Sequence, residues 1–324
     1  MFRPARIARG WKKTITIGSN MKILLFGKSG QVGWELQRSL APLGELIALN
    51  SSSTDLCGDF RDLTGIQESI RCIKPGIIVN AAAYTAVDKA EQEPELARTL
   101  NAEAPGLLAQ EAKRLNAWLI HYSTDYVFNG NGDQPFAETD DPEPLNVYGK
   151  TKLEGEQNIQ ASGCSHMIFR TSWVYAAFGS NFIKTILRLA QQRDSLNIVN
   201  DQIGTPTGAE LIADITAYAL LMLKRQSFTG GIYHLTAKGY TSWFEYAQLI
   251  LTHAMAANHP LKTQSGNLQP IPSGEFPLPA KRPLNSRLNT GKLEQALGVQ
   301  LPDWRTGVQR TLTEILSKPD PLSR

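Results

Sequence analysis

Tyr148 and Lys152 have the residue types and the spacing for acid–base chemistry. Residues four apart lie on one face of a helix, and Asn146 just upstream can cap a helix that runs to about residue 160. An ammonium group near a phenol lowers the phenol's pKa, which makes Tyr148 a better acid–base catalyst near neutral pH. One such pair among nine tyrosines is close to chance, so an ordinary amphipathic helix with an exposed lysine is the alternative.

A hydroxyl and a carboxyl follow an apolar run earlier in the chain. Thr124 and Asp125 follow Ser123 at the carboxyl end of Trp118–Tyr122, which reads as a buried strand. Ligands of open α/β sheets bind at the carboxyl ends of the strands, so a hydroxyl there can hydrogen-bond a substrate carbonyl. A plain strand-end turn uses the same residue types. The glycine turn described next, Thr124 and the Tyr148–Lys152 pair follow one another in the order and spacing of a single enzyme site, which favours the catalytic interpretation.

Three glycines with the spacing GxxGxxG lie between a strand and a helix. Gly27, Gly30 and Gly33 follow Lys22–Phe26 and open a helix over 31–40. Such glycines allow a tight turn, close approach to a pyrophosphate and close helix–sheet packing, while the helix N-terminus attracts the phosphates. The alternative is a purely structural turn. A P-loop is excluded because position 22, where that motif needs glycine, is lysine.

The end of the second strand bears on which dinucleotide binds. Asn50 and the serines after it offer no carboxylate to hold the ribose of NAD, and Lys28 can attract a 2′-phosphate, so NADPH is favoured with NADH as the alternative. Asp59 and Phe60 suit an adenine site, or equally a surface aspartate beside a core phenylalanine. The small residues 81–83 either admit the cofactor or pack tightly under a helix.

Strands and helices must alternate to place these groups together. Apolar runs of four to six residues are separated by helical patterns, which predicts a parallel sheet buried on both faces. The runs are Lys22–Phe26, Leu46–Leu49, Ile77–Asn80, Trp118–Tyr122 and Met167–Arg170, and a long helix is predicted over 94–115 with an interruption near Pro105. We therefore predict a doubly wound, Rossmann-type α/β fold. Residues 21–170 form the NAD(P)-binding domain, and residues 171–324 form a smaller, mainly substrate-binding domain interleaved with it.

Charge and composition exclude several classes of function. The chain has 33 basic and 30 acidic residues, but five of the basic ones lie in the acid-free residues 1–20. Subtracting these five from 33 leaves 28 basic residues against 30 acidic ones, so the remaining chain has a net charge of −2. A body of this charge has no bulk attraction for nucleic acid or anionic membranes. No run of residues is apolar and long enough to span a bilayer.

The cysteines and the tail suggest where the protein resides. Three widely spaced cysteines without a CxxC pair fit the reducing cytoplasm, and five scattered histidines show no zinc-ligand spacing. Residues 1–20 lack the apolar stretch of a secretory signal. We interpret them as a disordered basic extension or an upstream start, with a transit peptide as the alternative.

The motifs together resemble the extended short-chain dehydrogenase/reductases, and within them the family of dTDP-4-dehydrorhamnose reductases. The resemblance runs from Met21 to the C-terminus. It is carried by Met21–Leu40, Ile77–Glu91, His121–Gly130, Pro144–Glu156, Phe169–Ala176, Asn200–Leu211, Gly231–Leu235 and Arg282–Thr290. It implies reduction of a C4 carbonyl on a dTDP-sugar by NADPH, with Tyr148 as proton donor, Lys152 as its partner and Thr124 as the third catalytic residue.

The same resemblance implies further site residues. The cofactor would contact Gly30, Gln31, Val32, Asp59, Phe60, Ala83, Tyr84 and Thr85, and the sugar nucleotide Thr124, Asp125 and Trp173. Arg282 and Arg287 in a C-terminal loop suit clamps for the diphosphate, or else surface salt bridges. Some relatives hold Mg²⁺ at a homodimer interface, which would use Glu35, Glu210 and a C-terminal glutamate such as Glu314; plain surface charge is the alternative.

Two other functions stay open at this point. Non-catalytic NADP-binding regulatory subunits, such as the β-subunit of methionine adenosyltransferase, share this family resemblance, although intact Thr124, Tyr148 and Lys152 favour an enzyme. An epimerase, dehydratase or reductase acting on another nucleotide sugar is the second alternative. A dehydratase needs an Asp-Glu pair beside Thr124, and here Asp125 is followed by Tyr126.

Overall fold

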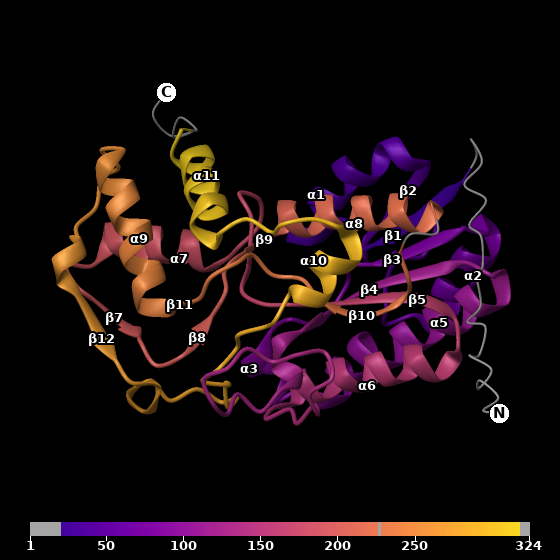
Figure 1. Ribbon diagram of the computed structural model, residues 1–324, viewed down its shortest axis with the longest axis horizontal. Helices are drawn as coiled ribbons and strands as arrows, with labels where there is room; N and C mark the ends of the chain where they lie inside the picture. Colours follow the sequence, from indigo (N-terminus) through magenta and orange to yellow (C-terminus); the bar gives the residue numbers. More distant parts are fainter. Residues whose placement is uncertain (1–20, 226–227, 318–324) are drawn as a thin grey trace, which may run out of the picture.

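The computed structural model describes residues 21–225 and 228–317. The predicted extension 1–20 lies outside the described residues. One parallel sheet forms the centre of the larger part of the molecule (Figure 1). Its six strands occur in the order β10-β5-β4-β3-β1-β2, with the bounds β1 Lys22–Phe26, β2 Glu45–Leu49, β3 Ile77–Asn80, β4 Trp118–Thr124, β5 Ser165–Thr171 and β10 Gly231–His234.

Helices cover both faces of this sheet, as the continuous apolar strands require. One face packs on α1 (Gln31–Leu40), α8 (Ala209–Lys224) and α10 (Gly291–Leu297). The other face packs on α2 (Leu63–Ile73), α5 (Ala104–Leu115) and α6 (Val147–Ser162). Figure 1 shows α1 and α8 above the strands and α5 and α6 below them. The predicted doubly wound α/β fold is confirmed.

The strand order reverses between β1 and β3, and ligands of such sheets bind at this switch point. The ends of the central strands are in register there: Phe26 pairs with Asn80, and Asn80 with His121. Thr124, at the end of β4, pairs with Thr171 of β5. The glycine turn, the loop after β3 and the Thr124 segment therefore meet at one edge of the sheet.

The long helix predicted over 94–115 has a different interruption from the one expected. It consists of α4 (Pro94–Arg98), a π-helical turn (Thr99–Glu103) and α5. Pro105 lies in the first turn of α5, where its missing N–H costs no hydrogen bond. The break therefore comes before the proline. Such π turns occur often at functional sites.

The remaining chain builds a second part with its own core. This core packs α7 (Phe182–Gln192), α9 (Trp243–Ala256) and α11 (Trp304–Leu316) together. Three short pairs of strands complete it: β6 (Val174–Tyr175) with β9 (Thr207–Gly208), β7 (Leu196–Val199) with β12 (Leu268–Ile271), and β8 (Ile203–Gly204) with β11 (Thr241–Ser242). Residues beyond 170 also supply β10, α8 and α10 to the first part, so the two parts interleave.

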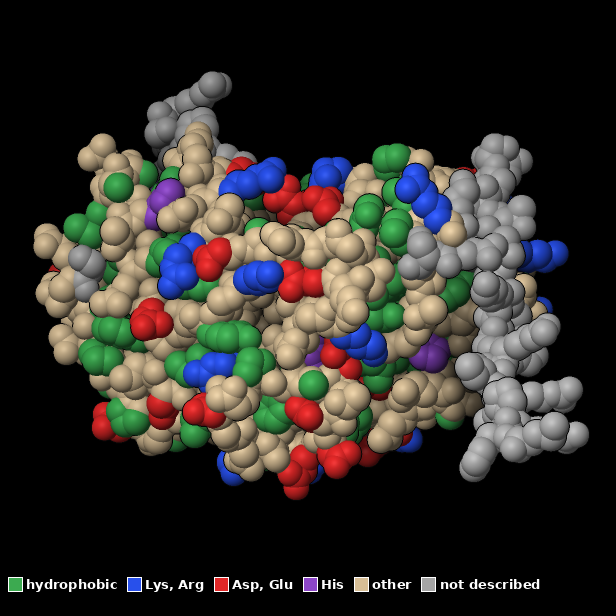
Figure 2. Space-filling view, viewed as in Figure 1, with side chains coloured by type: hydrophobic (Ala, Val, Ile, Leu, Met, Phe, Trp, Pro, Cys, Tyr) green, Lys and Arg blue, Asp and Glu red, His purple; other side chains and the backbone are tan. Residues whose placement is uncertain are grey.

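The surface mixes charges of both signs. Figure 2 shows blue and red side chains interspersed over the visible face. Within the described residues, no helix has the length and apolar character needed to cross a membrane.

Candidate active site

Thr124 and Tyr148 meet through their hydroxyl groups. Thr124 is the last residue of β4, and Tyr148 lies in the first turn of α6. The predicted cap is confirmed, because Asn146 Oδ1 accepts from the backbone N–H of Gly149 at 2.8 Å. The Tyr148 side chain hydrogen-bonds that of Thr124. A strand end and a helix start, 24 residues apart in sequence, therefore present two hydroxyls to one spot.

The protonation of Tyr148 differs from the expectation. Burial raises the pKa of Tyr148 to about 12, with the hydrogen bond to Thr124 opposing this and the charge of Asp125 adding to it. The pKa of Tyr148 therefore lies above its ordinary value, so the prediction that the ammonium of Lys152 lowers it is wrong. A Tyr148 that keeps its proton at neutral pH is suited to donate it.

Lys152 points at the strand instead of the phenol. Its side chain is 1% exposed, and its Nζ donates to the carbonyl oxygen of Tyr122 at 2.5 Å and lies 3.2 Å from His121 Nε2. Burial lowers the pKa of Lys152 to about 8, against the attraction of Glu156. That glutamate is itself paired with Arg170, at 2.6 Å, in a buried ion pair.

Asp125 is a buried carboxylate beside both hydroxyls. It is 3% exposed, and its Oδ1 accepts from the Thr124 hydroxyl at 3.0 Å. Burial raises the pKa of Asp125 to about 6, although hydrogen bonds from Ser286 and Thr124 lower it in part. Its Oδ2 has no partner among the described residues. An unpaired buried acceptor next to two hydroxyls suits a hydroxyl-bearing ligand.

The glycine turn fits a dinucleotide. Gly27 has φ +85°, and a Cβ there would lie 2.5 Å from the backbone nitrogen of Ala82. A Cβ on Gly33 would lie 2.0 Å from the Gly27 oxygen, whereas a Cβ on Gly30 would meet nothing nearer than 3.5 Å. Gly30 also caps α1 without a side-chain hydrogen bond. The helix start thus leaves its amides and the space beside them to a pyrophosphate.

The adenine-site residues are engaged with other groups. Asp59 forms an ion pair with Arg61 at 2.6 Å, which holds the pKa of Asp59 below its ordinary value. Phe60 is 3% exposed and packs edge-on against Phe26 in the core. These contacts match the alternative of a surface aspartate beside a core phenylalanine. A contact of either side chain with adenine stays a prediction.

The other predicted cofactor residues line the same edge. The Oδ1 of Asn50, at the end of β2, accepts from the hydroxyl of Ser53 at 3.1 Å. Tyr84 is held through its backbone, since Asn101 Oδ1 accepts from its N–H at 2.9 Å and Asn101 Nδ2 donates to its carbonyl at 3.1 Å. Its neighbours Ala83 and Thr85 are half-buried and exposed, and Gln31 and Val32 begin α1.

Asn101 belongs to the π turn and was not expected in the site. The turn brings its amide to the loop after β3, and no local sequence pattern signals that contact. The same holds for Ser286, which reaches Asp125 from far along the chain.

Trp173 adopts a conformation that is rare for a residue with a side chain. It follows β5 with φ 47°, and its ring stacks on Trp243 at 3.5 Å between centroids. A Cβ on Gly204 would lie 2.5 Å from the Trp173 ring. Strained backbone of this kind concentrates at functional sites. The glycine and the second tryptophan, neither of which was expected, fix the orientation of Trp173.

The two arginines of the C-terminal loop differ in whether a carboxylate already binds their guanidinium groups. Arg282 donates to both carboxylate oxygens of Asp88, at 3.0 and 2.7 Å, which matches the salt-bridge alternative. Arg287 donates to Asn285 Oδ1 at 3.0 Å and lies over the ring of Tyr240. No carboxylate among the described residues pairs with Arg287, so it is the better placed of the two to bind a phosphate.

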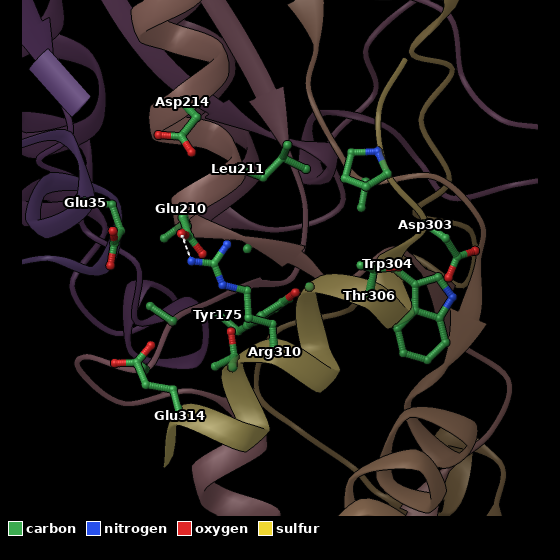
Figure 3. Close-up of a pocket in the computed structure, with 18 residues that line it drawn as sticks. Glu35, Tyr175, Glu210, Leu211, Asp214, Asp303, Trp304, Thr306, Arg310 and Glu314 are labelled. Atoms are coloured by element: carbon green, nitrogen blue, oxygen red, sulfur yellow. Dashed lines mark ion pairs between the residues drawn. The ribbon is translucent and has the colours of Figure 1, made fainter. Parts of the chain in front are cut away.

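The glutamates predicted for Mg²⁺ lie around one cavity of about 200 Å³ (Figure 3). Glu35, Glu210 and Glu314 all line it, and burial together with the other two raises the pKa of Glu35. Glu210, however, forms an ion pair with Arg310 at 2.8 Å. Among residues 21–225 and 228–317, no group of three metal-ligating side chains is placed to hold a metal. The described part of a single chain therefore does not fit a magnesium site.

Comparison with known proteins follows the same division of the chain. Residues 21–317 match the model of the RmlD substrate binding domain family. The chain belongs to this family. The match begins one residue before β1 and leaves out the basic residues 1–20.

Named members of the RmlD family are closely similar. The chain is 55% identical over 297 residues to the dTDP-4-dehydrorhamnose reductase of Escherichia coli K12, covering 92% of this chain and 99% of that protein. The crystal structure of the Clostridium acetobutylicum dTDP-4-dehydrorhamnose reductase has a TM-score of 0.82 at 34% identity, covering 91% and 99%. The Bacillus anthracis enzyme, in complex with NADP, has 0.80 at 32% identity, with the same coverage.

Proposed function

We propose that this protein reduces the C4 carbonyl of dTDP-4-dehydro-β-L-rhamnose with NADPH, giving dTDP-β-L-rhamnose. The observation that carries the proposal is the Thr124–Tyr148 hydroxyl pair beside buried Lys152, at the sheet edge that also holds the glycine turn. The 55% identity to a named dTDP-4-dehydrorhamnose reductase supports the substrate. The chain therefore acts as an oxidoreductase in dTDP-rhamnose synthesis.

The chain's own residues handle the proton and the developing charge. Bound NADPH supplies the hydride. Tyr148 keeps its proton at neutral pH, because burial raises its pKa, and gives that proton to the C4 oxygen. Thr124 donates a hydrogen bond to the same oxygen, and fixed donors of this kind stabilise charge as it forms. Asp125 accepts from a sugar hydroxyl through its unpaired Oδ2.

The preference for NADPH rests on the end of β2. Asn50 supplies an amide where NAD-specific proteins carry a carboxylate, so nothing there repels a 2′-phosphate. The NADP complex of the Bacillus anthracis relative supports this choice. Comparable kcat/KM values for NADH and NADPH would instead favour use of both.

In this proposal the two parts of the molecule bind different ligands. Residues 21–170 bind the cofactor, and residues 171–324 mainly hold the sugar nucleotide through Trp173 and Arg287. A homodimer and a cytoplasmic location stay predictions.

The test follows NADPH oxidation with dTDP-4-dehydrorhamnose as substrate. Tyr148→Phe removes the proton donor and leaves the ring, and we expect its turnover to fall at least ~100-fold while NADPH still binds. Cofactor fluorescence measures the binding separately. A folded, NADPH-binding wild type without turnover would favour the regulatory-subunit alternative, and faster turnover of another nucleotide sugar would reassign the substrate.

A further inference from the structure

A chain of hydrogen bonds connects the loop after β3 to Lys152. The backbone N–H of Ala82 donates to Asn80 Oδ1 at 3.0 Å, and Asn80 Nδ2 lies 3.0 Å from His121 Nδ1. His121 Nε2 lies 3.2 Å from Lys152 Nζ, which donates to the carbonyl oxygen of Tyr122 at 2.5 Å. Asn80, His121 and Lys152 are each 1% exposed. Solvent therefore does not compete for these contacts.

The backbone N–H of Ala82 fixes which atom donates in each of these hydrogen bonds. An N–H group can only donate, so the Asn80 atom facing Ala82 is the carbonyl oxygen and the one facing His121 is the amide nitrogen. That nitrogen donates, so His121 Nδ1 accepts and carries no proton. A neutral imidazole then has its proton on Nε2, which points at Lys152.

Only an uncharged amine can complete this arrangement. An ammonium group has three donors and no lone pair, so it cannot accept from His121 Nε2–H. A doubly protonated His121 is disfavoured, because burial alone favours the neutral ring and is the largest cause that holds the pKa of His121 well below its ordinary value. The neutral amine accepts from His121 and still donates to Tyr122, which satisfies both neighbours.

The charged groups around Lys152 leave this balance intact. On its own helix, Glu156 attracts a proton to Lys152, but its carboxylate is bound by Arg170 of β5. From β4 the facing group is neutral His121, and from β3 it is the uncharged amide of Asn80. Burial outweighs Glu156 and lowers the pKa of Lys152 to about 8.

We propose that His121 is a positioning residue that stabilises the uncharged amine of Lys152 before the dinucleotide binds, and that binding of the dinucleotide shifts Lys152 fully to the ammonium form. One N–H bond forms on Nζ with a proton taken from solvent, and the hydrogen bond from His121 breaks. The anionic dinucleotide, bound at the same sheet edge, stabilises the new charge. This inference rests on the proposed function only through cofactor binding, not through the sugar.

The arrangement solves a problem of charge burial. A buried, unpaired ammonium is costly, and His121 reduces that cost because it accommodates the neutral form. Lys152 becomes cationic when an anion arrives that the charge can bind. Because the series of hydrogen bonds starts at Ala82, in the predicted cofactor loop, a shift of that loop is transmitted to Lys152 through Asn80 and His121.

The test measures protons taken up when NADP⁺ binds, with an indicator dye in weakly buffered solution. At about pH 8.5 a group with a pKa near 8 is about three-quarters neutral, so the wild type takes up about 0.7 proton per bound NADP⁺. In His121→Gln the amide can turn its oxygen to an ammonium. We expect uptake below about 0.3 proton and a Lys152 pKa at least ~1 unit higher in the pH dependence of NADP⁺ affinity.

A second variant reverses the direction of the hydrogen bonds between position 80, His121 and Lys152 without removing them. The carboxylate in Asn80→Asp must receive the ring proton on His121 Nδ1, which frees Nε2 to accept from an ammonium, so uptake is lost here too. His234→Gln is the matched control: His234 is fully buried in β10, in the same sheet, and does not contact Lys152. It should keep the wild-type uptake.

The outcomes separate this inference from the proposed reaction. Wild-type uptake in folded, NADP⁺-binding His121→Gln and Asn80→Asp would overturn it, as would absence of uptake in the wild type. If His121→Gln does not fold, Asn80→Asp decides. Normal uptake without turnover of the sugar would overturn the proposed function alone, and failure of the wild type to bind NADP⁺ would overturn both.

Discussion

Replacing Asp125 by asparagine should make the protein more stable at neutral and alkaline pH. The carboxylate is 3% exposed, and its Oδ2 finds no hydrogen-bond donor in the described residues. Burial therefore disfavours its charged form and raises the pKa of Asp125 to about 6. The amide in Asp125→Asn would keep the shape and the acceptor oxygen that Thr124 uses, and it removes the charge.

The size of the effect follows from linkage. The folded protein binds the Asp125 proton more tightly than the unfolded chain, so stability falls as pH rises from the unfolded pKa of 3.8 to the folded value of about 6. At about 1.4 kcal/mol for each pH unit, the full destabilisation above that range is about 3 kcal/mol. Below about pH 3 both states are largely protonated and the term vanishes.

Urea unfolding of the wild type and Asp125→Asn between about pH 3 and 8 tests this reasoning. The difference in unfolding free energy should shift in favour of the variant by about 3 kcal/mol from the acid to the alkaline end. NADPH turnover by the more stable variant should decrease, because stability and activity often trade at such sites. A difference that does not change with pH would refute the account of Asp125.

Three further changes have defined outcomes. Gly204→Ala places a Cβ 2.5 Å from the Trp173 ring, so we expect the KM for the sugar nucleotide to rise ~10-fold or more in steady-state assays. Glu156→Gln leaves the buried Arg170 without its carboxylate and should lower the free energy of unfolding in urea by about 3–5 kcal/mol. Its control is Glu154→Gln on the same helix, which breaks an exposed ion pair with Arg98 and should lower that free energy by less than about 1 kcal/mol. Deletion of residues 1–20 should leave NADPH oxidation unchanged; lost activity would give the tail a function.

Local sequence patterns predict much of the fold and the centre of the site. The apolar run ending at Phe26 and the glycines after it predict a strand–turn–helix unit, because each part of that signal lies within a few residues. Tyr148 and Lys152 are likewise placed on one helix by their spacing. Thr124 joins them because parallel strands end at a common edge.

The missing parts depend on contacts between distant segments. The direction of the Lys152 side chain is set by the Tyr122 carbonyl and by His121, whose partner Asn80 is fixed only by strand register. Ser286 reaches Asp125 from beyond the second core. Side-chain types at Asp59 and Glu210 suggested ligands, yet nearby arginines bind both. No periodicity in the sequence reveals such pairings.

The late position of β10 in the chain has a consequence for synthesis. The sheet gains its sixth strand only at Gly231–His234, and one of its faces is covered by α8 and α10 as well as α1, so residues 21–170 alone cover only part of that apolar face. While the ribosome makes the first half, Leu25, Val79 and Ile120 lack part of their packing. Folding must then wait for distant segments, a period in which chains are prone to aggregate. We therefore expect that residues 21–170 do not fold as an independent module before α8, β10 and α10 have been made.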